Sequence, residues 1–485
     1  MAKVIKAKDG ATKLNISLLG IFLLAISFFK LNDYSDTMVS ILGIVTVITY
    51  GVVIWAWYAH TKKVVSLFFI FLIMCFLFNA GQILIGAFDI SFVGVVNIYK
   101  AYNNRLLAEM MLFQSKCVLA LGIGGCLAYR GQAYDFGDFN LPQHNENKSK
   151  SNKVGLLEVV YLIVFAVTML IYLREFFTRS GVSYGEYYYG EREGISIQLL
   201  FIYHVLLYVA FIKHDKDRFS KLLFVLNIML IFVMLMIGSR SVILQVVFGC
   251  LFIYIYIKRN YINVSFAKVV MYSLIGLVVV VFFSGLQELR QVSFSEISLD
   301  KLAEIYSGSF MDGIVKSFVQ TGGTARCILQ TMSEIQSGAA STEQTFFYAF
   351  AKGFVPVGVL SALGVHAPIN SSLAAWITEA GGSYSGWGYS IFAEMYYNFR
   401  EWGWIFGIIF AFVYVKLEQK ALDLVKEGRV FFAGGLIYVL SYAVYLSRSD
   451  MALISSRMRF CVYLALISFI MKQCGIKFKL KTATE

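Results

Sequence analysis

Residues 64–87 read VVSLFFIFLIMCFLFNAGQILIGA and contain no Asp, Glu, Lys or Arg. A helix of about 20 apolar residues is long enough to cross the ~30 Å hydrocarbon core of a lipid bilayer. Lipid offers no partner to backbone N–H and C=O groups, so a spanning segment must satisfy its own hydrogen bonds as a helix. This stretch therefore predicts a membrane-spanning helix.

Apolar runs of similar length recur along the 485 residues of the chain. Hydrophobic residues make up 58% of the sequence and charged residues only 15%, whereas soluble domains carry about 25% charged residues. We therefore expect an all-α polytopic membrane protein with about 12 transmembrane helices. The expected spans lie near residues 14–29, 37–58, 64–87, 106–128, 154–173, 195–212, 222–238, 241–257, 269–285, 402–415, 430–447 and 452–471.

The connection between the ninth and tenth spans, residues 286–401, is much longer than the other connections. It separates a membrane domain of residues 1–285, with spans 1–9, from a second membrane part of residues 402–485, with spans 10–12. A connection of that length without secondary structure would be unusual in a compact protein. We therefore expect a large, mostly helical segment on the outer face.

Two sequence patterns predict helices within this long segment. Apolar residues at spacings of three and four, from Leu299 to Phe318, predict an amphipathic helix that lies on the membrane or packs on the spans. Residues 345–363 are apolar but are interrupted by Gly353, Pro356 and Gly358. The interruption favours a re-entrant or interfacial element over a membrane span.

The distribution of basic residues predicts the orientation of the chain. With the N-terminus inside, the inner segments hold 21 Lys and 4 Arg, the outer segments hold 5 Lys and 11 Arg, and Lys116 lies within the fourth span. Lysine-rich inner segments follow the positive-inside rule and place both termini in the cytoplasm. Arginine presents a planar fork that binds phosphate or carboxylate with two hydrogen bonds. The outer arginines therefore favour a polyanionic ligand, although anchoring at the interface or structural pairing with carboxylates is the alternative for each one.

Motifs for nucleotide or metal chemistry are absent from the sequence, which contains neither GxxxxGK[ST] nor HExxH. Asp215 and Asp217 form a DxD pattern, but the inner loop around them is too short for a nucleotide-binding domain, and we interpret it as a solvated charge run. Of the five histidines only His366 is expected outside, which disfavours a histidine-based metal site. We expect no metal, no cofactor and no nucleic-acid partner.

Charged residues at membrane depth are candidate functional residues, because a charge in lipid is costly. Arg240 ends the short turn Gly238-Ser239-Arg240 between two expected spans, and Glu394 lies in an apolar and aromatic stretch. A carboxyl group in such surroundings has a raised pKa unless a nearby arginine keeps it ionised. Four more charged residues gather near the outer end of the last two spans: Arg448, Asp450, Arg457 and Arg459.

At these positions the chain resembles the Wzy-type O-antigen and repeat-unit polysaccharide polymerases. The features that carry the resemblance are GSR at 238–240, a Tyr-rich outer loop after the fifth span, the long outer segment, and GYSIFAEMYYNF at 388–399 followed by WGWIFGIIFAF at 402–412. Many members of that family have Gly directly after the Asn-Phe pair, whereas Arg400 and Glu401 intervene here.

The resemblance implies an inverting glycosyl transfer at the outer face of the bacterial cytoplasmic (inner) membrane. The donor would be a glycan on a polyprenyl diphosphate, and the acceptor a sugar hydroxyl on a second lipid-linked repeat unit. Neither nucleotide nor metal would take part. Membrane lipid, a chain-length regulator and a flippase are the further partners that such a polymerase implies.

The resemblance and the charges together suggest roles for individual residues. Because no metal is expected, cations of the protein must stabilise the diphosphate leaving group, and a carboxylate or imidazole must take the proton of the acceptor hydroxyl. The candidates for the diphosphate site are Arg240, Arg326, Arg448, Arg457 and Arg459. The candidate bases are Glu394 first, then Asp450 and His366. The candidates for glycan binding are Arg174, Arg179, Arg192 and Tyr187.

Three alternative functions stay open at this point. An O-antigen ligase of the same architecture would transfer glycan to a lipid core, and a base histidine in the outer segment such as His366 would favour it. A lipid-linked oligosaccharide flippase would predict internal repeats and short outer loops, and the sequence has neither. A non-catalytic assembly scaffold is the third alternative.

Overall fold

The computed structural model describes residues 2–29, 31, 33–61, 66–90, 96–129, 155–179, 197–214, 217–237, 240–259, 300, 310–340, 343–382 and 387–473. Within these ranges the chain is helical and has no β-strand. This observation confirms the all-α class.

The long helices come in two groups along the chain. Those before the long segment are α1 (Ala2–Phe28), α2 (Asp36–Thr61), α3 (Leu67–Ala87), the short α4 (Ile98–Ala101), α5 (Asn104–Ala128), α6 (Leu156–Arg179), α8 (Ile197–Lys213), α9 (Arg218–Ile237) and α10 (Arg240–Leu251), which continues as a π-helix over Phe252–Arg259. Those after it are α19 (Gly403–Lys426), α20 (Val430–Ala443), which a 3₁₀ turn extends over Val444–Arg448, and α21 (Met451–Gln473).

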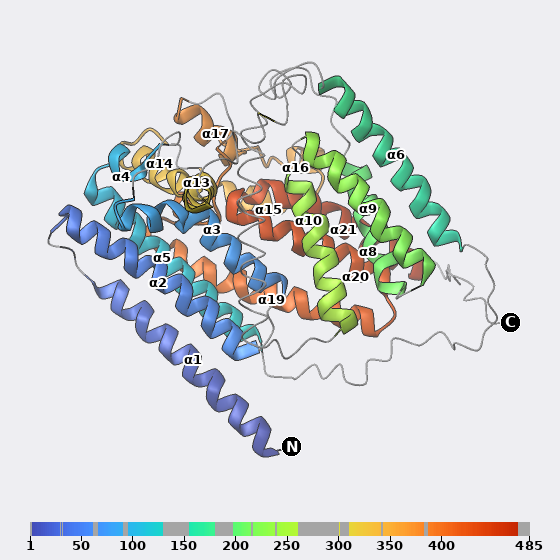
Figure 1. The fold of residues 1–485 in the computed structure, drawn as a ribbon, viewed down its shortest axis with the longest axis horizontal. Helices are drawn as coiled ribbons and strands as arrows, with labels where there is room; N and C mark the ends of the chain where they lie inside the picture. Colours follow the sequence, from blue (N-terminus) through green and yellow to red (C-terminus); the bar gives the residue numbers. More distant parts are fainter. Residues whose placement is uncertain are drawn as a thin grey trace.

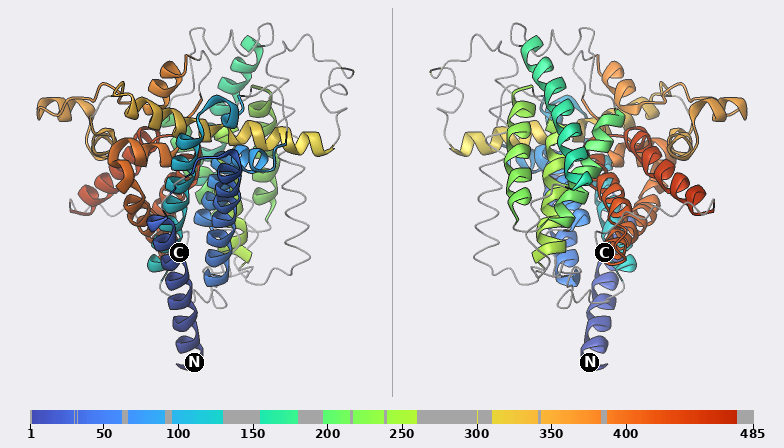
Figure 2. Two further views of the ribbon diagram at one scale, coloured as in Figure 1. Left: turned by 90° about the vertical axis from the view of Figure 1, so that its left-hand side faces the viewer. Right: turned by 90° about the vertical axis from the view of Figure 1, so that its right-hand side faces the viewer.

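The long segment between them is built of shorter helices. They are α13 (Phe310–Thr321), a 3₁₀ turn (Gly322–Thr324), α14 (Ala325–Gln336), α15 (Thr345–Phe354), α16 (Val357–Ala362), α17 (Leu373–Ala380), α18 (Ile391–Phe399) and a 3₁₀ turn (Arg400–Trp402). In Figure 2 the yellow to light-orange helices of this segment gather toward the end of the bundle opposite to the N-terminus of α1.

Membrane-spanning character follows from length and composition. Six helices of the described ranges are long and apolar enough to cross a bilayer: Asp36–Thr61, Leu67–Ala87, Asn104–Ala128, Leu156–Thr178, Arg218–Ile237 and Val430–Arg448. Shorter apolar helices occur at Leu14–Phe28, Gln198–Lys213 and Val242–Ile255. Helices also stand at the other expected spans, α19 and α21, while the expected span 269–285 lies outside the described residues. The count of 12 spans stays a prediction.

The segment 345–363 is divided as its sequence predicts. Helix α15 ends at Phe354, Pro356 precedes α16, and neither helix is long enough to span a membrane. Proline has no N–H to continue a helix, which explains the break. Large apolar side chains on α15 and α16 are exposed, among them Phe347, Phe350 and Val359. Whether the element re-enters the membrane stays a prediction.

The centre of the bundle is α5, which packs against α1, α2 and α19 (Figure 1). It approaches α19 closely at Gly124, where a Cβ atom would lie 2.1 Å from the carbonyl oxygen of Ile408. Small residues at such crossings allow two helix backbones to touch inside a membrane, where the hydrophobic effect does not drive helices together. The α5–α19 contact therefore depends on the absence of a side chain.

We expect Gly124→Ala to lower the stability of the protein, because the added methyl group can only fit if one helix backbone moves. Overpacking of this kind costs about 1–3 kcal/mol, measurable as a lower thermal unfolding midpoint in detergent. Gly51→Ala on α2 is the matched control, because a Cβ there meets nothing within 4 Å and alanine favours the helix. An unchanged midpoint for the Gly124 variant would contradict the close packing.

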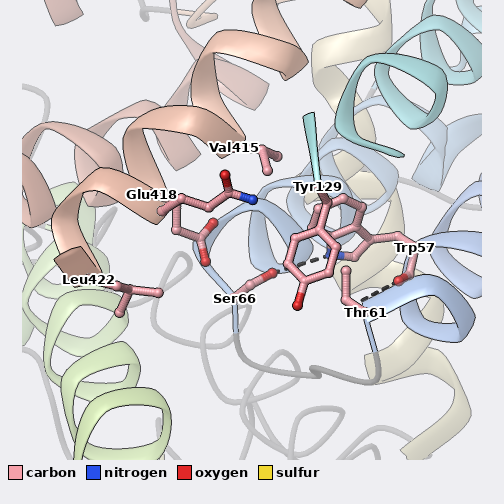
Figure 3. A pocket seen from close by; sticks show the side chains of 8 residues that line it. Trp57, Thr61, Ser66, Tyr129, Val415, Glu418 and Leu422 are labelled. Atoms are coloured by element: carbon pink, nitrogen blue, oxygen red, sulfur yellow. Dashed lines mark hydrogen bonds between the residues drawn. The ribbon is translucent and has the colours of Figure 1, made fainter. Parts of the chain in front are cut away.

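Two polar arrangements join helices at the end of the bundle away from the long segment. Figure 3 shows a small pocket where Trp57 donates a hydrogen bond from Nε1 to Ser66 Oγ (3.3 Å). Beside it the buried carboxylate of Glu418 accepts the Phe68 N–H at the start of α3 (3.1 Å). A carboxylate at a helix N-terminus satisfies an N–H group and the helix dipole together, so α19 is fastened to α3 there.

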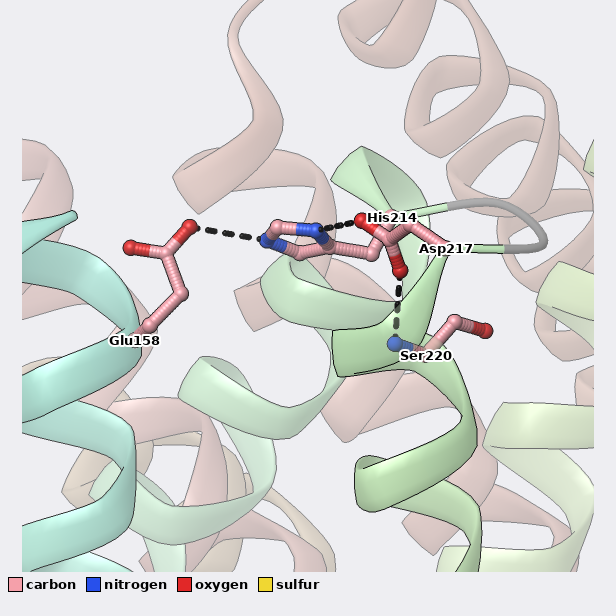
Figure 4. Close-up of polar contacts among 4 residues, drawn as sticks. All are labelled: Glu158, His214, Asp217 and Ser220. Carbon is pink, nitrogen blue, oxygen red and sulfur yellow. Dashed lines mark hydrogen bonds and ion pairs between the residues drawn. The ribbon is translucent and has the colours of Figure 1, made fainter. Parts of the chain in front are cut away.

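The second arrangement joins α6 to the α8–α9 hairpin (Figure 4). His214 contacts Glu158 on α6 through Nε2 (2.9 Å) and Asp217 through Nδ1 (2.6 Å), and Asp217 also accepts the Ser220 N–H (2.7 Å). Asp217, the second acid of the DxD pattern, is partly exposed and caps α9, while residues 215–216 lie outside the described part. Its contacts are those of a structural cap.

Candidate functional site

Two acidic side chains meet where α21 begins. Glu394, on α18, accepts the N–H of Met451 on its Oε2 atom (2.7 Å). Asp450 precedes α21 and accepts the N–H of Leu453 (3.2 Å). The first N–H groups of a helix have no partner within the helix, and they carry partial positive charge. The start of α21 therefore brings together two carboxyl groups that are 56 positions apart in the sequence.

The two carboxyl groups differ in what their oxygens contact. Both oxygens of Asp450 accept backbone N–H groups, Oδ1 from Leu453 and Oδ2 from Ala374 at the start of α17 (3.1 Å). Asp450 thereby fixes two helices. Among the described residues, Glu394 accepts a hydrogen bond on Oε2 alone, and apolar side chains such as Phe346 surround it. Glu394 is the better placed of the two to act on another molecule.

Burial raises the pKa of Glu394 well above its usual range, and the negative charge of nearby Asp450 raises it further. The Met451 N–H and the Lys352 ammonium act in the opposite direction. Desolvation dominates because the side chain is only 4% exposed and the charged form loses its hydration. When ionised, such a carboxylate is a stronger base than an ordinary one.

Lys352 is a site residue that sequence reasoning missed. It lies on α15 and interacts electrostatically with Asp450, Arg459 and Glu394, while burial lowers its pKa. The Nε atom of Arg459 donates to the backbone carbonyl of Lys352 (3.1 Å), which joins α21 to α15. Lys352 is the only charged residue in the apolar stretch 345–363, and that isolation was the available signal.

Arg326 and Arg448 lie close to each other around Cys327. Both interact with Cys327 on α14, whose thiol donates to Gly388 O (3.9 Å). The Arg326 guanidinium stacks on the ring of Trp387 at 3.6 Å, and Arg448 lies 5.5 Å from the ring of Phe78. Both guanidinium groups thus lie against aromatic faces, and the Arg326 side chain also interacts with the Tyr102 hydroxyl.

Tyr389 connects Arg448 to the acids. Its N–H donates to Arg448 O (3.0 Å), and its side chain interacts electrostatically with Glu394 and Asp450. The next residue, Ser390, caps α18 and donates from Oγ to Asn79 Oδ1 (2.7 Å) on α3. Both contacts are buried. The two residues before α18 are therefore held by Arg448 on one side and by α3 on the other.

Asn398 joins α18 to α15 one turn after Glu394. Its Oδ1 accepts the N–H groups of Thr345 (2.8 Å) and Phe346 (3.0 Å), and its Nδ2 donates to Glu394 O (3.0 Å). One amide side chain thereby satisfies the first turn of α15 and holds it against the helix that carries Glu394. Lys352, on α15, is positioned by the same contact.

Within the described ranges, three of the candidate arginines form no salt bridge. Among the described residues, no carboxylate lies within ion-pair distance of Arg326, Arg448 or Arg459. Structural pairing of arginine with carboxylates was the main alternative to ligand binding for these residues. The described contacts do not support that alternative.

The remaining predicted site residues lie elsewhere or cannot be placed. Arg457 points away from Arg459, because two residues along a helix turn the side chain by about 200°, and it contacts Tyr442 on α20 instead. His366 is exposed after α16, and no described contact links it to the carboxyl pair. Arg240 is the first residue of α10, and its side chain lies outside the described part.

The predicted glycan-binding residues are mostly outside the described ranges as well. Tyr187 and Arg192 lie outside them, and only the backbone of Arg179, the last residue of α6, is described. Arg174 is exposed near the same end of α6. Their role stays a prediction. The described residues contain no group of three His, Cys, Asp or Glu side chains that could hold a metal ion.

The family model for the O-antigen polysaccharide polymerase Wzy matches residues 14–477. The chain belongs to this family. The match to the Wzy family includes every candidate site residue, and it confirms the resemblance expected from the sequence. With its apolar helices, the Wzy family chain is an integral membrane protein of polysaccharide biosynthesis. No curated protein and no solved structure gives a significant match to the chain.

Proposed function

We propose that this chain joins polyprenyl-diphosphate-linked oligosaccharide repeat units into surface polysaccharide at the outer face of the bacterial cytoplasmic membrane. The observation that carries the proposal is the arrangement at the start of α21. A buried acid, Glu394, lies near Lys352, and among the described residues no carboxylate forms a salt bridge with Arg448 or Arg459.

In the proposed reaction Glu394 accepts the proton of the acceptor hydroxyl. The hydroxyl oxygen attacks the anomeric carbon of the donor glycan, and the bond from that carbon to the diphosphate oxygen breaks. The electron pair stays on the diphosphate, which leaves with an added negative charge. Attack from the face opposite to the leaving group inverts the anomeric configuration.

We propose that four cations stabilise the diphosphate: Arg326, Arg448, Arg459 and Lys352. Fixed cations placed where charge develops lower the barrier without any reorganisation at the moment of reaction. Arg240 stays a candidate for the same role from its place at the start of α10. We assign Asp450 a positioning role, because both of its oxygens bind backbone N–H groups of two helices.

The proposal includes an orientation and partners. Both termini lie in the cytoplasm, and the segment 286–401 faces outward. The place of its described helices toward the end of the bundle opposite to the N-terminus agrees with this orientation (Figure 2). The substrates reach the site from the membrane as lipid-linked oligosaccharides. A flippase that supplies them and a chain-length regulator are the expected protein partners.

The reaction should need neither metal nor nucleotide. We expect the purified protein, given a polyprenyl-diphosphate-linked repeat unit, to form polymer at the same rate with excess EDTA as with magnesium, because protein cations stabilise the leaving group. The product ladder on a gel measures the rate. Activity that disappears with EDTA and returns with Mg²⁺ or Mn²⁺ would contradict the arginine-based mechanism.

A further inference from the structure

Arg457 lies on the face of α21 that is turned away from the carboxyl pair. The side chain is 7% exposed, and its Nη2 atom donates to the hydroxyl of Tyr442 (2.9 Å). Its Nε and Nη1 atoms are buried and have no hydrogen-bond partner among the described residues. The guanidinium also stacks on the Tyr442 ring at 4.6 Å. Most of its donor groups are therefore unused.

Two further buried polar groups lie around this guanidinium. His204 Nε2, on α8, has no partner among the described residues, and the Tyr438 hydroxyl, on α20, interacts with the Arg457 side chain. Both side chains are fully buried, their rings are 5.3 Å apart, and His204 also interacts electrostatically with Arg457. Three helices thus direct polar groups toward one place in the bundle, and atoms of Arg457 and His204 there have no partner among the described residues.

The chemistry of the three groups is specific. His204 Nδ1 lies 2.6 Å from the carbonyl oxygen of Leu200, so Nδ1 carries the proton and Nε2 presents a lone pair. Arg457 and Tyr438 offer N–H and O–H donors. The cluster therefore fits a group with several acceptor oxygens and one hydroxyl that can donate to Nε2.

The charge of the cluster requires an anion. A buried guanidinium is costly unless an opposite charge compensates it, and among the described residues no carboxylate pairs with Arg457. Water could accept hydrogen bonds from the guanidinium but could not neutralise it. One positive charge is balanced by one negative charge, which a phosphate monoester with a single P–OH carries.

We propose that Arg457, His204 and Tyr438 form a binding site for a singly charged phosphate monoester, buried between α8, α20 and α21. Guanidinium and tyrosine donate to the charged phosphate oxygens, and the P–OH donates to His204 Nε2. The site is separate from the carboxyl pair, because Arg459 contacts α15 whereas Arg457 contacts α20. It goes beyond the proposed transfer reaction, and only the choice of a polyprenyl carrier as its source rests on that function.

Thermal unfolding of the delipidated full chain in detergent tests the site. Three probes are compared: a polyprenyl monophosphate, inorganic phosphate, and phosphatidylglycerol, which is a phosphodiester without P–OH. We expect the polyprenyl monophosphate to raise the unfolding midpoint of the wild-type protein, because a ligand that binds only the folded state stabilises it. A shift with inorganic phosphate as well would indicate a site for free phosphate.

The variants separate a ligand site from a structural arginine. Arg457→Met removes the uncompensated charge, so we expect its ligand-free midpoint to equal or exceed that of the wild type and the phosphate shift to disappear. Tyr438→Phe removes a hydroxyl beside the guanidinium, so phosphate affinity should fall about 10-fold, while the ligand-free midpoint should fall by no more than the loss of one hydrogen bond allows. Arg429→Gln, at the exposed start of α20, is the control and should behave like the wild type.

Three results would overturn the proposal. The first is a wild-type midpoint that responds neither to the polyprenyl monophosphate nor to inorganic phosphate. The second is a ligand-free Arg457→Met protein that is less stable than the wild type and keeps the phosphate shift. The third is an equal shift with phosphatidylglycerol, which would exclude the role of the P–OH group. Because the readout is binding, failure of the polymerisation mechanism would not affect it.

Discussion

Glu394→Gln should lower the rate of polymer formation by about 10²–10⁴-fold, which is the usual contribution of a positioned general base. Glutamine keeps the shape of the side chain and an oxygen that can accept the Met451 N–H, but it cannot take a proton from an acceptor hydroxyl. The measurement is polymer synthesis by purified protein, normalised to the amount of folded protein.

The same variant should be more stable than the wild type at neutral pH. Burial raises the folded-state pKa of Glu394, so between the unfolded and folded pKa values the folded state binds the extra proton. Wild-type stability therefore falls as pH rises above the ordinary pKa of glutamate, about 4.3, and stops falling above the raised folded value. Glutamine has no such dependence, so the difference in unfolding midpoint should grow over that range.

Activity should depend on pH in the opposite sense to stability. The base must be ionised, so the rate should rise with pH through the raised pKa of Glu394, above the range of an exposed carboxyl group. Asp450→Ala is the comparison, because the Asp450 carboxylate caps two helices. It should lower stability by about 1 kcal/mol. Full activity of the Gln variant would end the assignment of Glu394 as the base.

Arg448→Lys should reduce polymer synthesis by about 10²-fold, as the loss of one donor to a developing oxyanion does, with little change in protein level. Lysine keeps the positive charge but loses the planar fork of donors. If Arg448 only anchored the helix at the interface, charge alone would be sufficient and the lysine variant would stay active. The measurement is again the rate of polymer formation.

Arg105→Lys provides the control for this substitution. Arg105 is an exposed arginine at the start of α5 and pairs with Glu109 four residues later (2.8 Å). Exposed pairs of this kind contribute at most about 1 kcal/mol, so this variant should make polymer at the wild-type rate. Equal losses in both lysine variants would indicate a general effect on the membrane protein and contradict the specific role of Arg448.

The helices of the fold could be predicted from the sequence because apolar length decides them. In lipid the backbone must bond to itself, so a run such as 64–87 has few alternatives to a helix, and α3 occupies 67–87 of it. The contacts between helices could not be predicted in this way. The α5–α19 crossing depends on Gly124, which nothing in the sequence distinguishes among 39 glycines.

Part of the site could also be predicted from the sequence, because charged residues are conspicuous in apolar stretches. Glu394 and Asp450 stand out as acids in apolar surroundings, but their meeting at the start of α21 depends on the path of two helices between them. Arg457 and Arg459 are close in sequence, and their separation to opposite faces of α21 follows from the helical period alone. That separation was available from the sequence once α21 was assumed to be a helix.

The amide of Asn398 has a consequence for how loss-of-function variants are interpreted. It joins the first turn of α15 to the backbone of Glu394. The positions of Lys352 and Glu394 therefore both depend on this one side chain. A genetic screen that scores only surface polysaccharide would rank Asn398 beside the base, although its side chain is engaged by the protein itself. Substitutions of Asn398 should weaken several substrate contacts together. A second mutation that restores the packing of α15 against α18 by another contact should restore polymer formation without the amide.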